Sequence, residues 1–309
     1  MRGYIGVTDY AWFTYLRAIE PPITEVNFWR PGSETSFRVL QSGEPFFFRL
    51  KSPRNVIGGF AYFSYFSKLP TKVAWDIYGS GNGAASYPEF RSMLLNLRAR
   101  SAEPSDFTIG CVLLTEPQFF DENDWVKLPS NYIASIQQGK TYDLSTGEGE
   151  RIWLECLARA QSTGGIVSTI LDRPLIGGYG RPTLIRPRLG QRSFRVAVLD
   201  SYDRRCAVTS ERTLPALDAA HIRSFADVQE HSIPNGISLR ADIHKLFDKG
   251  YVTVTPDYHF LVSKTIKEEF ENGRDYYAMS GIAIRLPTNR ADRPADEALR
   301  WHNDNRFLG

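Results

Sequence analysis

Residues 218–250 hold three of the five histidines of this chain. Within them His221, Asn235, His244 and Asp248 follow the spacing H-x13-N-x8-H-x3-D. An imidazole can take a proton from water near neutral pH, and a divalent cation can stabilise the charge that develops on a phosphate during hydrolysis. Residues of these types at this spacing predict a metal-dependent nuclease.

The local pattern predicts where each of these residues lies. His221 comes near the end of a strand-like segment, residues 217–222, where it can act as a base. His244 and Asp248 are four residues apart, so on a helix they project from one face and can share one cation. Asn235 precedes a glycine at a turn, where its side chain can bond backbone groups and hold the chain in place.

The segments RRCAVTS, AAHI and NGISLRADIHKLFDKG resemble the HNH endonucleases with a ββα-metal fold, in particular the AHI-type branch found in restriction endonucleases. The resemblance covers roughly the last third of the chain. It implies that His221 is the general base, that Asn235 is a scaffold residue, and that His244 and Asp248 are metal ligands. One divalent cation is expected, Mg²⁺ first, with Mn²⁺, Co²⁺ or Ni²⁺ as substitutes at a site of histidine and carboxylate.

The chain departs from the family pattern at one position. Many HNH enzymes carry an Asp or His directly before the base, whereas this chain has Ala220. Asp218 lies two residues earlier, on the same face of the strand, and is our candidate for the missing metal ligand. An ordinary amphipathic helix around His244 is the alternative to a metal site. The three histidines outside the spacing are expected to be structural or surface residues: His231, His259 and His302.

Composition sets the broad class of the protein. A chain of 309 residues that is 42% hydrophobic and 23% charged is long enough for two domains with separate cores. Its net charge of +2 excludes a general polycation. Three widely spaced cysteines without a CxxC motif indicate a reducing cytoplasm and no structural zinc site. The sequence has neither a membrane-length apolar run nor a signal-peptide core, so we expect a cytoplasmic protein that does not contact membranes.

The first half of the chain contains short apolar and aromatic segments separated by Gly and Pro. Helical spacing of apolar residues predicts helices over residues 89–100 and 9–18. The remaining segments predict a small, twisted β-barrel that carries a few helices. The strands are expected at residues 4–8, 44–51, 56–66, 108–114 and 151–157.

Residues 27–100 resemble the PUA-superfamily modules of the EVE and SRA-like type that precede HNH domains in modification-dependent restriction enzymes. The resemblance rests on NFWRPG, GEPFFFRL and AWDIYGSGNGA. It implies a pocket that receives a flipped, modified cytosine (5-methyl or 5-hydroxymethyl), so that the partner is double-stranded DNA carrying that base. The pocket candidates lie beside polar or glycine-rich turns; a plain flexible loop is the alternative for the glycine-rich segment. These candidates are Trp29, Trp75, Asp76, Tyr78 and Asn82.

The junction between the two halves is rich in Gly, Pro and Arg. We expect a recognition domain over residues 1–160, a linker over 161–190 and a nuclease domain over 191–309. Periodicity leaves open whether residues 192–202 form a helix or a strand. Arginine pairs bidentately with phosphate, so this basic stretch suits a DNA backbone, although surface arginines that serve solubility are the alternative. The candidates for phosphate contact are Arg186, Arg188, Arg192, Arg204 and Arg205.

Together these patterns predict an α+β protein, with an N-terminal PUA-like β-barrel carrying helices and a C-terminal ββα-metal domain. The predicted function is a DNA endonuclease that finds a modified base and cuts nearby. One HNH site cuts one strand at a time, so a double-strand break favours a homodimer. Two alternatives stay open: an HNH nuclease with an unmodified DNA or RNA target, and a catalytically inactive reader of modified DNA.

Overall fold

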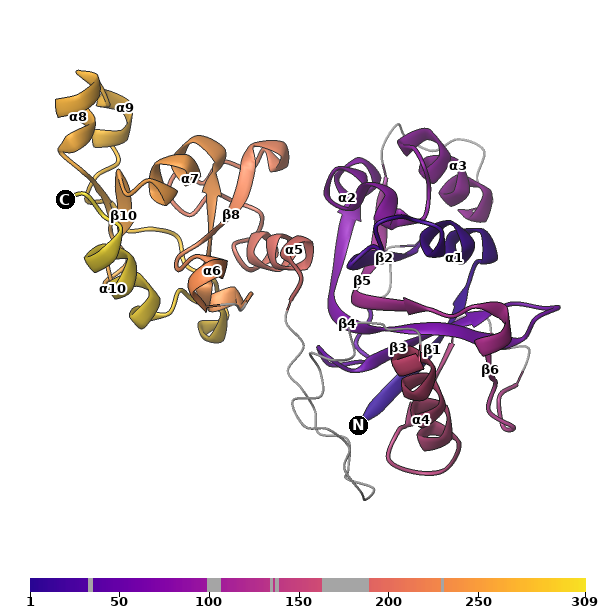
Figure 1. Ribbon diagram of the computed structural model, residues 1–309. Coiled ribbons are helices and arrows are strands. Elements are labelled where there is room, and N and C mark those ends of the chain that lie inside the picture. The colour runs from indigo at the N-terminus through magenta and orange to yellow at the C-terminus, as the bar shows by residue number, and fades with distance from the viewer. Residues whose placement is uncertain (33–35, 99–106, 134–135, 137–138, 163–188, 229–230) are drawn as a thin grey trace. The chain divides into compact units, whose positions relative to one another are not determined.

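The computed structural model describes residues 1–32, 36–98, 107–133, 136, 139–162, 189–228 and 231–309 (Figure 1). The chain divides into two compact units, Met1–Gly190 and Gln191–Gly309. Most of the predicted linker, including residues 163–188, lies outside the described residues. The helices in the described ranges are all too short or too polar to cross a membrane.

Within the described residues, the first unit is built on one mixed seven-stranded sheet. Its strand order is β2-β5-β4-β3-β1-β7, with β6 paired to β4. β1 and β3 are parallel, and the other pairs are antiparallel. The order ends at β2 and β7, so the sheet is open and the predicted closed barrel is not seen. The strands are β1 (Arg2–Thr8), β2 (Glu25–Arg30), β3 (Pro45–Leu50), β4 (Val56–Pro70), β5 (Thr108–Phe119), β6 (Val126–Lys127) and β7 (Gly139–Asp143).

Apolar side chains cover both faces of this sheet, which explains why β3 reads as a continuous aromatic run. Successive side chains in a strand point to opposite faces. Phe46 and Phe48 therefore lie on one face, where Phe48 packs against Trp12 with ring centroids 5.5 Å apart. Phe47 lies on the other face, where its ring centroid is 6.1 Å from that of Trp153. The sheet thus has a core on each side.

Helices supply the second layer on each of these faces. Figure 1 shows α1 (Tyr10–Arg17), α2 (Thr71–Tyr78) and α3 (Tyr87–Arg98) on one side of the sheet, and α4 (Gly147–Ser162) on the other. α1 begins at Asp9, whose carboxylate accepts hydrogen bonds from the backbone N–H groups of Ala11 and Trp12. Such an N-cap satisfies two N–H groups that have no partner within the helix.

The strand predicted at residues 151–157 is wrong, because this segment lies within α4. Ile152, Trp153, Cys156 and Ala160 are buried, and they recur at helical and not at alternating spacing. Residues 151–157 span only about two turns of a helix. A segment this short does not distinguish the helical period of 3.6 residues from the strand period of two. The buried residues form a long apolar stripe along one face of α4. The stripe packs against the sheet and anchors the helix.

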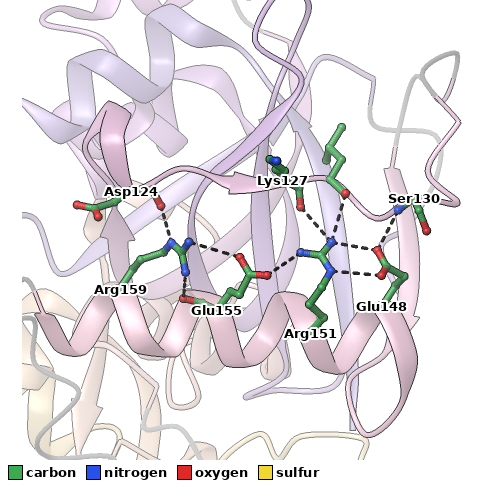
Figure 2. Close-up of polar contacts among 8 residues, drawn as sticks. Asp124, Lys127, Ser130, Glu148, Arg151, Glu155 and Arg159 are labelled. Carbon is green, nitrogen blue, oxygen red and sulfur yellow. Dashed lines mark hydrogen bonds and ion pairs between the residues drawn. The ribbon is translucent and has the colours of Figure 1, made fainter.

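A network of charged side chains joins the outer side of α4 to the segment around β6 (Figure 2). Arg151 pairs with Glu148 at 3.0 Å and with Glu155 at 2.9 Å. Its guanidinium also donates to the backbone carbonyl of Lys127 at 3.3 Å, and that of Arg159 donates to the carbonyl of Asp124 at 2.9 Å. The arginines satisfy backbone groups of an irregular segment and so fix it against the helix.

The second unit contains two short hairpins and several helices in its described residues. β8 and β9 are antiparallel, as are β10 and β11. Residues 192–202, which periodicity left open, are almost entirely helical in α5. The elements are α5 (Gln191–Ser201), β8 (Leu217–His221), α6 (Phe225–Val228), β9 (Gly236–Arg240), α7 (Ala241–Asp248), β10 (Val252–Val254), β11 (Phe260–Val262), α8 (Thr265–Phe270), α9 (Arg274–Tyr277) and α10 (Asp296–Asn305).

Taken together, the two units make a mixed α+β protein, as the sequence predicted. The second unit has a core of its own, in which Phe194 of α5 is 1% exposed and Phe247 of α7 is fully buried. The hairpin β8–β9 packs against α5 at one point that only glycine allows: a Cβ on Gly236 would lie 2.5 Å from Val198 and 2.9 Å from Phe194. The hairpin therefore rests directly on the helix that follows the junction.

Candidate functional site

The β8–β9 hairpin and α7 bring the predicted nuclease residues together. His221 is the last residue of β8, and it pairs with Gly236 at the start of β9. α7 begins directly after β9, so His244 and Asp248 come back toward the end of β8. The strand–strand–helix order places side chains from three separate stretches of sequence in one region.

The His221 ring is held by two neighbours. It stacks on Phe194 with ring centroids 4.0 Å apart and an interplanar angle of 13°. Its Nε2 lies 2.9 Å from Nδ1 of His231, a hydrogen-bonding distance. Burial, together with His231 and His244, lowers the pKa of His221 from 6.5 to about 4. The imidazole is therefore neutral at neutral pH and is able to accept a proton.

Asn235 fixes the chain directly after His221. Its Oδ1 accepts a hydrogen bond from the backbone N–H of Arg223, and its Nδ2 donates to the carbonyl of the same residue, both at 2.9 Å. Its own carbonyl accepts from the N–H of Ile222 at 2.9 Å. The side chain is 7% exposed. Asn235 therefore satisfies partly buried backbone groups, a geometry compatible with the expected scaffold role.

The ring of His244 lies between two carboxylates. Its Nδ1 is 3.5 Å from Asp218 and its Nε2 is 3.3 Å from Asp248. Burial alone would lower the pKa of His244, but the hydrogen bonds and charges of Asp248 and Asp218 together raise it above 6.5. Asp218 also lies 3.4 Å from Arg195 of α5. The two carboxylates face opposite nitrogens of one ring.

This arrangement suits a divalent cation by its chemistry, but it is not a closed metal cage. Within the described part of the chain, no group of three or more His, Cys, Asp and Glu side chains is arranged to hold a metal ion. One ring nitrogen of a ligating histidine usually donates to a carboxylate, while the other binds the metal. His244 and Asp248 fit the ligand pair, and Asp218 fits the carboxylate that orients the ring better than it fits a third ligand.

His231 is the residue of this region that sequence reasoning missed. It lies outside the H-N-H-D spacing and was expected to be structural or on the surface, yet its ring contacts His221 directly. Phe225 stacks on its outer side, with ring centroids 4.2 Å apart and an interplanar angle of 14°. A usable signal existed in the sequence, because the loop between the predicted base and scaffold residues contains one further imidazole.

The other two histidines play different parts. His302 of α10 is 2% exposed; its ring stacks on Phe247 at 3.8 Å and makes hydrogen bonds with Thr253 and with the carbonyl of Phe247. It is a core residue, as expected, and it ties α10 to α7. His259 pairs with Asp257 at 3.0 Å and is 42% exposed.

The predicted phosphate-binding arginines are only partly described. Arg186 and Arg188 lie outside the described residues. Arg192 is a partly buried residue of α5. Arg204 pairs with Asp200 at 2.7 Å, and Arg205 follows it in the turn after α5. The nearby Arg195 donates to the carbonyl of Leu217 at 2.7 Å, so this arginine supports the β8 strand.

The first unit contains a cavity of about 450 Å³ between α1 and the sheet. Aromatic side chains form much of its wall, and charged side chains also line it. Of the predicted pocket residues, Trp29 lines this cavity. The aromatic lining is Tyr4, Trp12, Phe28, Trp29, Phe37 and Phe46, and the charged lining is Asp9, Arg30 and Lys51.

The other four predicted pocket residues lie outside the described lining of this cavity. Asn82 is fully buried and holds its turn together: its Nδ2 donates to the carbonyls of Ala74 and Gly79, and its Oδ1 accepts from Asn27. Tyr78 is 1% exposed within the core. The two remaining residues make surface or packing contacts: Trp75 with Phe90 and Tyr87, and Asp76 with Lys72.

Comparison with known families identifies the second unit. A family model described as HNH endonuclease matches residues 206–255, which include β8, β9, α7 and β10. No curated protein matches the chain. The chain therefore carries a domain of the HNH endonuclease family, a family of nucleases that hydrolyse phosphodiester bonds.

Three solved structures resemble the chain distantly. Two mutants of the ZmASCH protein from Zymomonas mobilis match at 11% identity; each match covers 49% of this chain, with 96% and 94% of the ZmASCH chains and TM-scores of 0.35 and 0.31. A modification-dependent TagI restriction endonuclease matches at 12% identity, over 99% of this chain and 81% of that chain, with a TM-score of 0.28.

Proposed function

We propose that this protein is a DNA endonuclease of the modification-dependent restriction type, in which the first unit binds a flipped, modified cytosine and the second cuts the DNA. The observation that carries the proposal is a neutral His221 held at the end of β8, close to the His244–Asp248 pair of α7. A base and a candidate metal pair in one region are the two requirements of metal-assisted phosphodiester hydrolysis.

Each residue of the site has a role in this reaction. His221 removes a proton from the attacking water, and Asn235 keeps its loop in place through the backbone of Arg223. His244 and Asp248 hold one divalent cation, Mg²⁺ first, with Mn²⁺, Co²⁺ or Ni²⁺ able to replace it. When bound, the cation stabilises negative charge on the phosphate and on the leaving oxygen. Asp218 orients the His244 ring and is itself held by Arg195.

The cavity of the first unit supports recognition of a flipped base. Its volume of about 450 Å³ falls in the range of small-molecule sites, and its wall combines stacking rings with a few charged groups. Flipped bases are held in this way, between aromatic side chains and polar groups that read the base edge. In this proposal Trp29 remains a residue of the base pocket. The other pocket residues are the described residues that line the cavity, and they do not include Trp75, Asp76, Tyr78 and Asn82.

Contacts with the DNA backbone fall to the arginines at the junction. We assign phosphate contacts to Arg186, Arg188, Arg192, Arg204 and Arg205, because guanidinium groups pair with phosphate irrespective of sequence. Two strands need two cuts, so the protein acts on double-stranded DNA as a homodimer. All three cysteines are buried, as suits thiols in the cytoplasm.

Digestion of plasmid DNA tests the proposal. Methylated, hydroxymethylated and plain plasmids of one sequence are incubated with Mg²⁺ and either the wild type or His221→Ala. We expect cleavage of a modified plasmid by the wild type, with a rate roughly 10² to 10⁴ lower in the variant. DNA binding should persist in the variant, because the base contributes little to holding the backbone. Equal cleavage of all three plasmids would indicate an unmodified target instead.

A catalytically inactive reader of modified DNA is the second candidate. Ala220, where many HNH enzymes have a further ligand, and the lack of a three-ligand cluster in the described residues favour it. The two candidates differ in metal binding and in turnover. A reader would bind modified DNA without cutting it in Mg²⁺, Mn²⁺, Co²⁺ or Ni²⁺, and calorimetric titration with Mn²⁺ would give no heat of binding.

A further inference from the structure

His231 contacts the proposed base through a single hydrogen bond between two ring nitrogens. Nε2 of His221 and Nδ1 of His231 are 2.9 Å apart, and the two rings are tilted by 49°. One proton can occupy such a contact, so one nitrogen donates and the other accepts. The direction of this hydrogen bond decides which nitrogen of His221 carries a proton in the neutral ring.

The two directions have different consequences for catalysis. If Nε2 of His221 donates to His231, the neutral ring has its lone pair on Nδ1, where it can take a proton from water. If His231 donates instead, the proton of neutral His221 sits on Nδ1, and neither nitrogen can then serve as a base. Only the first direction is compatible with the role of His221 in the proposed function.

We propose that His231 is a positioning residue that accepts a hydrogen bond from Nε2–H of His221 and thereby fixes the base in its productive tautomer. This inference rests on the proposed function, because it takes His221 as the general base. In the reaction the proton lost by water enters Nδ1 of His221, while the Nε2 proton stays in the hydrogen bond to His231. The contact also fixes the ring orientation, as the third member of a catalytic triad does.

The surroundings of His231 are built to hold its ring. Phe225 stacks on it from one side at 4.2 Å, and the ring centroid of Phe194 lies 5.5 Å away. Phe194 also stacks on His221, so the same phenyl ring aligns both imidazoles. A carboxylate in this aromatic setting would lose hydration without full compensation, whereas a neutral imidazole accepts a hydrogen bond at less cost. This explains why a histidine suits the position.

Two variants separate the hydrogen bond from the stacking. His231→Phe keeps an aromatic ring for Phe225 but removes the acceptor. His231→Asn removes the ring but keeps an oxygen at the position of Nδ1, so it can still accept from Nε2–H. His259→Asn is the matched control, because this histidine is 42% exposed and has no part in the site.

Nitrogen chemical shifts of the five histidines report the tautomer directly. In protein with ¹⁵N-labelled histidine near neutral pH, we expect His221 of the wild type and of His231→Asn to carry its proton on Nε2. In His231→Phe we expect a mixture of the two tautomers. A wild-type His221 with its proton on Nδ1, or a His231→Phe spectrum identical to the wild type, would overturn the inference.

Cleavage kinetics give the second readout. We expect kcat to fall about 10- to 100-fold in His231→Phe, by analogy with residues that orient a metal-binding side chain through one hydrogen bond. KM should stay unchanged, and His231→Asn should regain most of the lost kcat. A loss in His231→Asn with unchanged kcat in His231→Phe would mean that the ring only packs, and it would overturn the inference. A wild type that cuts no DNA would remove the proposed function, while the tautomer measurement would still decide the hydrogen bond.

Discussion

The carboxamide of Asn235 binds both the N–H and the carbonyl of Arg223, each at 2.9 Å. One side chain thus replaces the backbone partners that a longer β8–β9 ladder would have supplied. The two residues are separated by a loop, and the contact closes that loop two residues after His221. The position of the proposed base therefore depends on an amide that lies fourteen residues away in the sequence.

We expect Asn235→Ala to destabilise the second unit. The change leaves a partly buried N–H and a partly buried carbonyl of Arg223 without their partner, and an unsatisfied group costs at most about 1 to 3 kcal/mol. Urea unfolding gives the loss in the free energy of unfolding. Asn305→Ala is the control, because this exposed residue of α10 should change stability by less than about 0.5 kcal/mol. Equal stability of the two variants would contradict the scaffold role.

Removal of the His244 imidazole should weaken metal binding. We expect His244→Ala to lose most of the affinity for Mn²⁺ in calorimetric titration, because one of the two proposed ligands is gone. Asp218→Asn should weaken binding less, by about 10- to 100-fold, since it alters only the group that orients His244. Asp248→Asn should be milder than His244→Ala, because an amide oxygen can still coordinate weakly. Unchanged affinity in His244→Ala would remove the ligand assignment.

His302 should make the stability of the second unit depend on pH. Burial lowers its pKa from 6.5 to about 4 in the folded protein. Its contribution is therefore fully present above pH 6.5 and is lost as the pH falls toward 4, because the unfolded chain binds the proton first. The expected loss is about 3 kcal/mol, from roughly 1.4 kcal/mol for each pKa unit.

A variant isolates this contribution from that of His221, whose pKa is also lowered to about 4. His302→Gln keeps a donor and an acceptor for Phe247 and Thr253 but does not titrate in this range. Unfolding in urea at several pH values between 6.5 and 4 should show a smaller slope in the variant. The same slope in both proteins would show that His302 titrates alike in the folded and unfolded states.

The candidate site was more predictable from sequence than the fold around it. The spacing of His221, Asn235, His244 and Asp248 is local information, because one hairpin and one helix carry all four. The strand before His221 and the helix around His244 are present as β8 and α7. His231 was not predictable from the same spacing, because its place depends on how the loop between β8 and β9 folds back onto His221.

In the first unit, by contrast, the residues that line the cavity could not be predicted from the sequence. Its aromatic residues serve both faces of a sheet, and alternation cannot tell which of them border an empty space. Asn82 stands in a glycine-rich segment that suggested ligand contact. Its side-chain amide instead makes hydrogen bonds with Asn27, Ala74 and Gly79. Whether a polar side chain faces a ligand or its own backbone is decided by tertiary contacts, which residue order does not reveal.

Two tryptophans that looked alike in the sequence give the sharpest test of the first unit. Trp29 lines the cavity, whereas Trp75 packs between Phe90 and Tyr87 and takes no part in the described lining. If a flipped base stacks on Trp29, Trp29→Leu should remove roughly 1 to 3 kcal/mol of binding to modified DNA. Trp75→Leu, the matched control, should leave the preference for modified DNA unchanged.

The measurement compares the affinity of each variant for a methylated and an unmethylated duplex at one fixed salt concentration. Non-specific binding depends on phosphate contacts and on salt, so Trp29→Leu should bind the unmethylated duplex as the wild type does. Circular dichroism first establishes that the sheet is intact, because Trp29 Nε1 also donates to the carbonyl of Asn82 at 2.8 Å. A folded Trp29→Leu that keeps the full preference for the methylated duplex would exclude this cavity as the base pocket, and a loss confined to Trp75→Leu would place the pocket on the α2–α3 side instead.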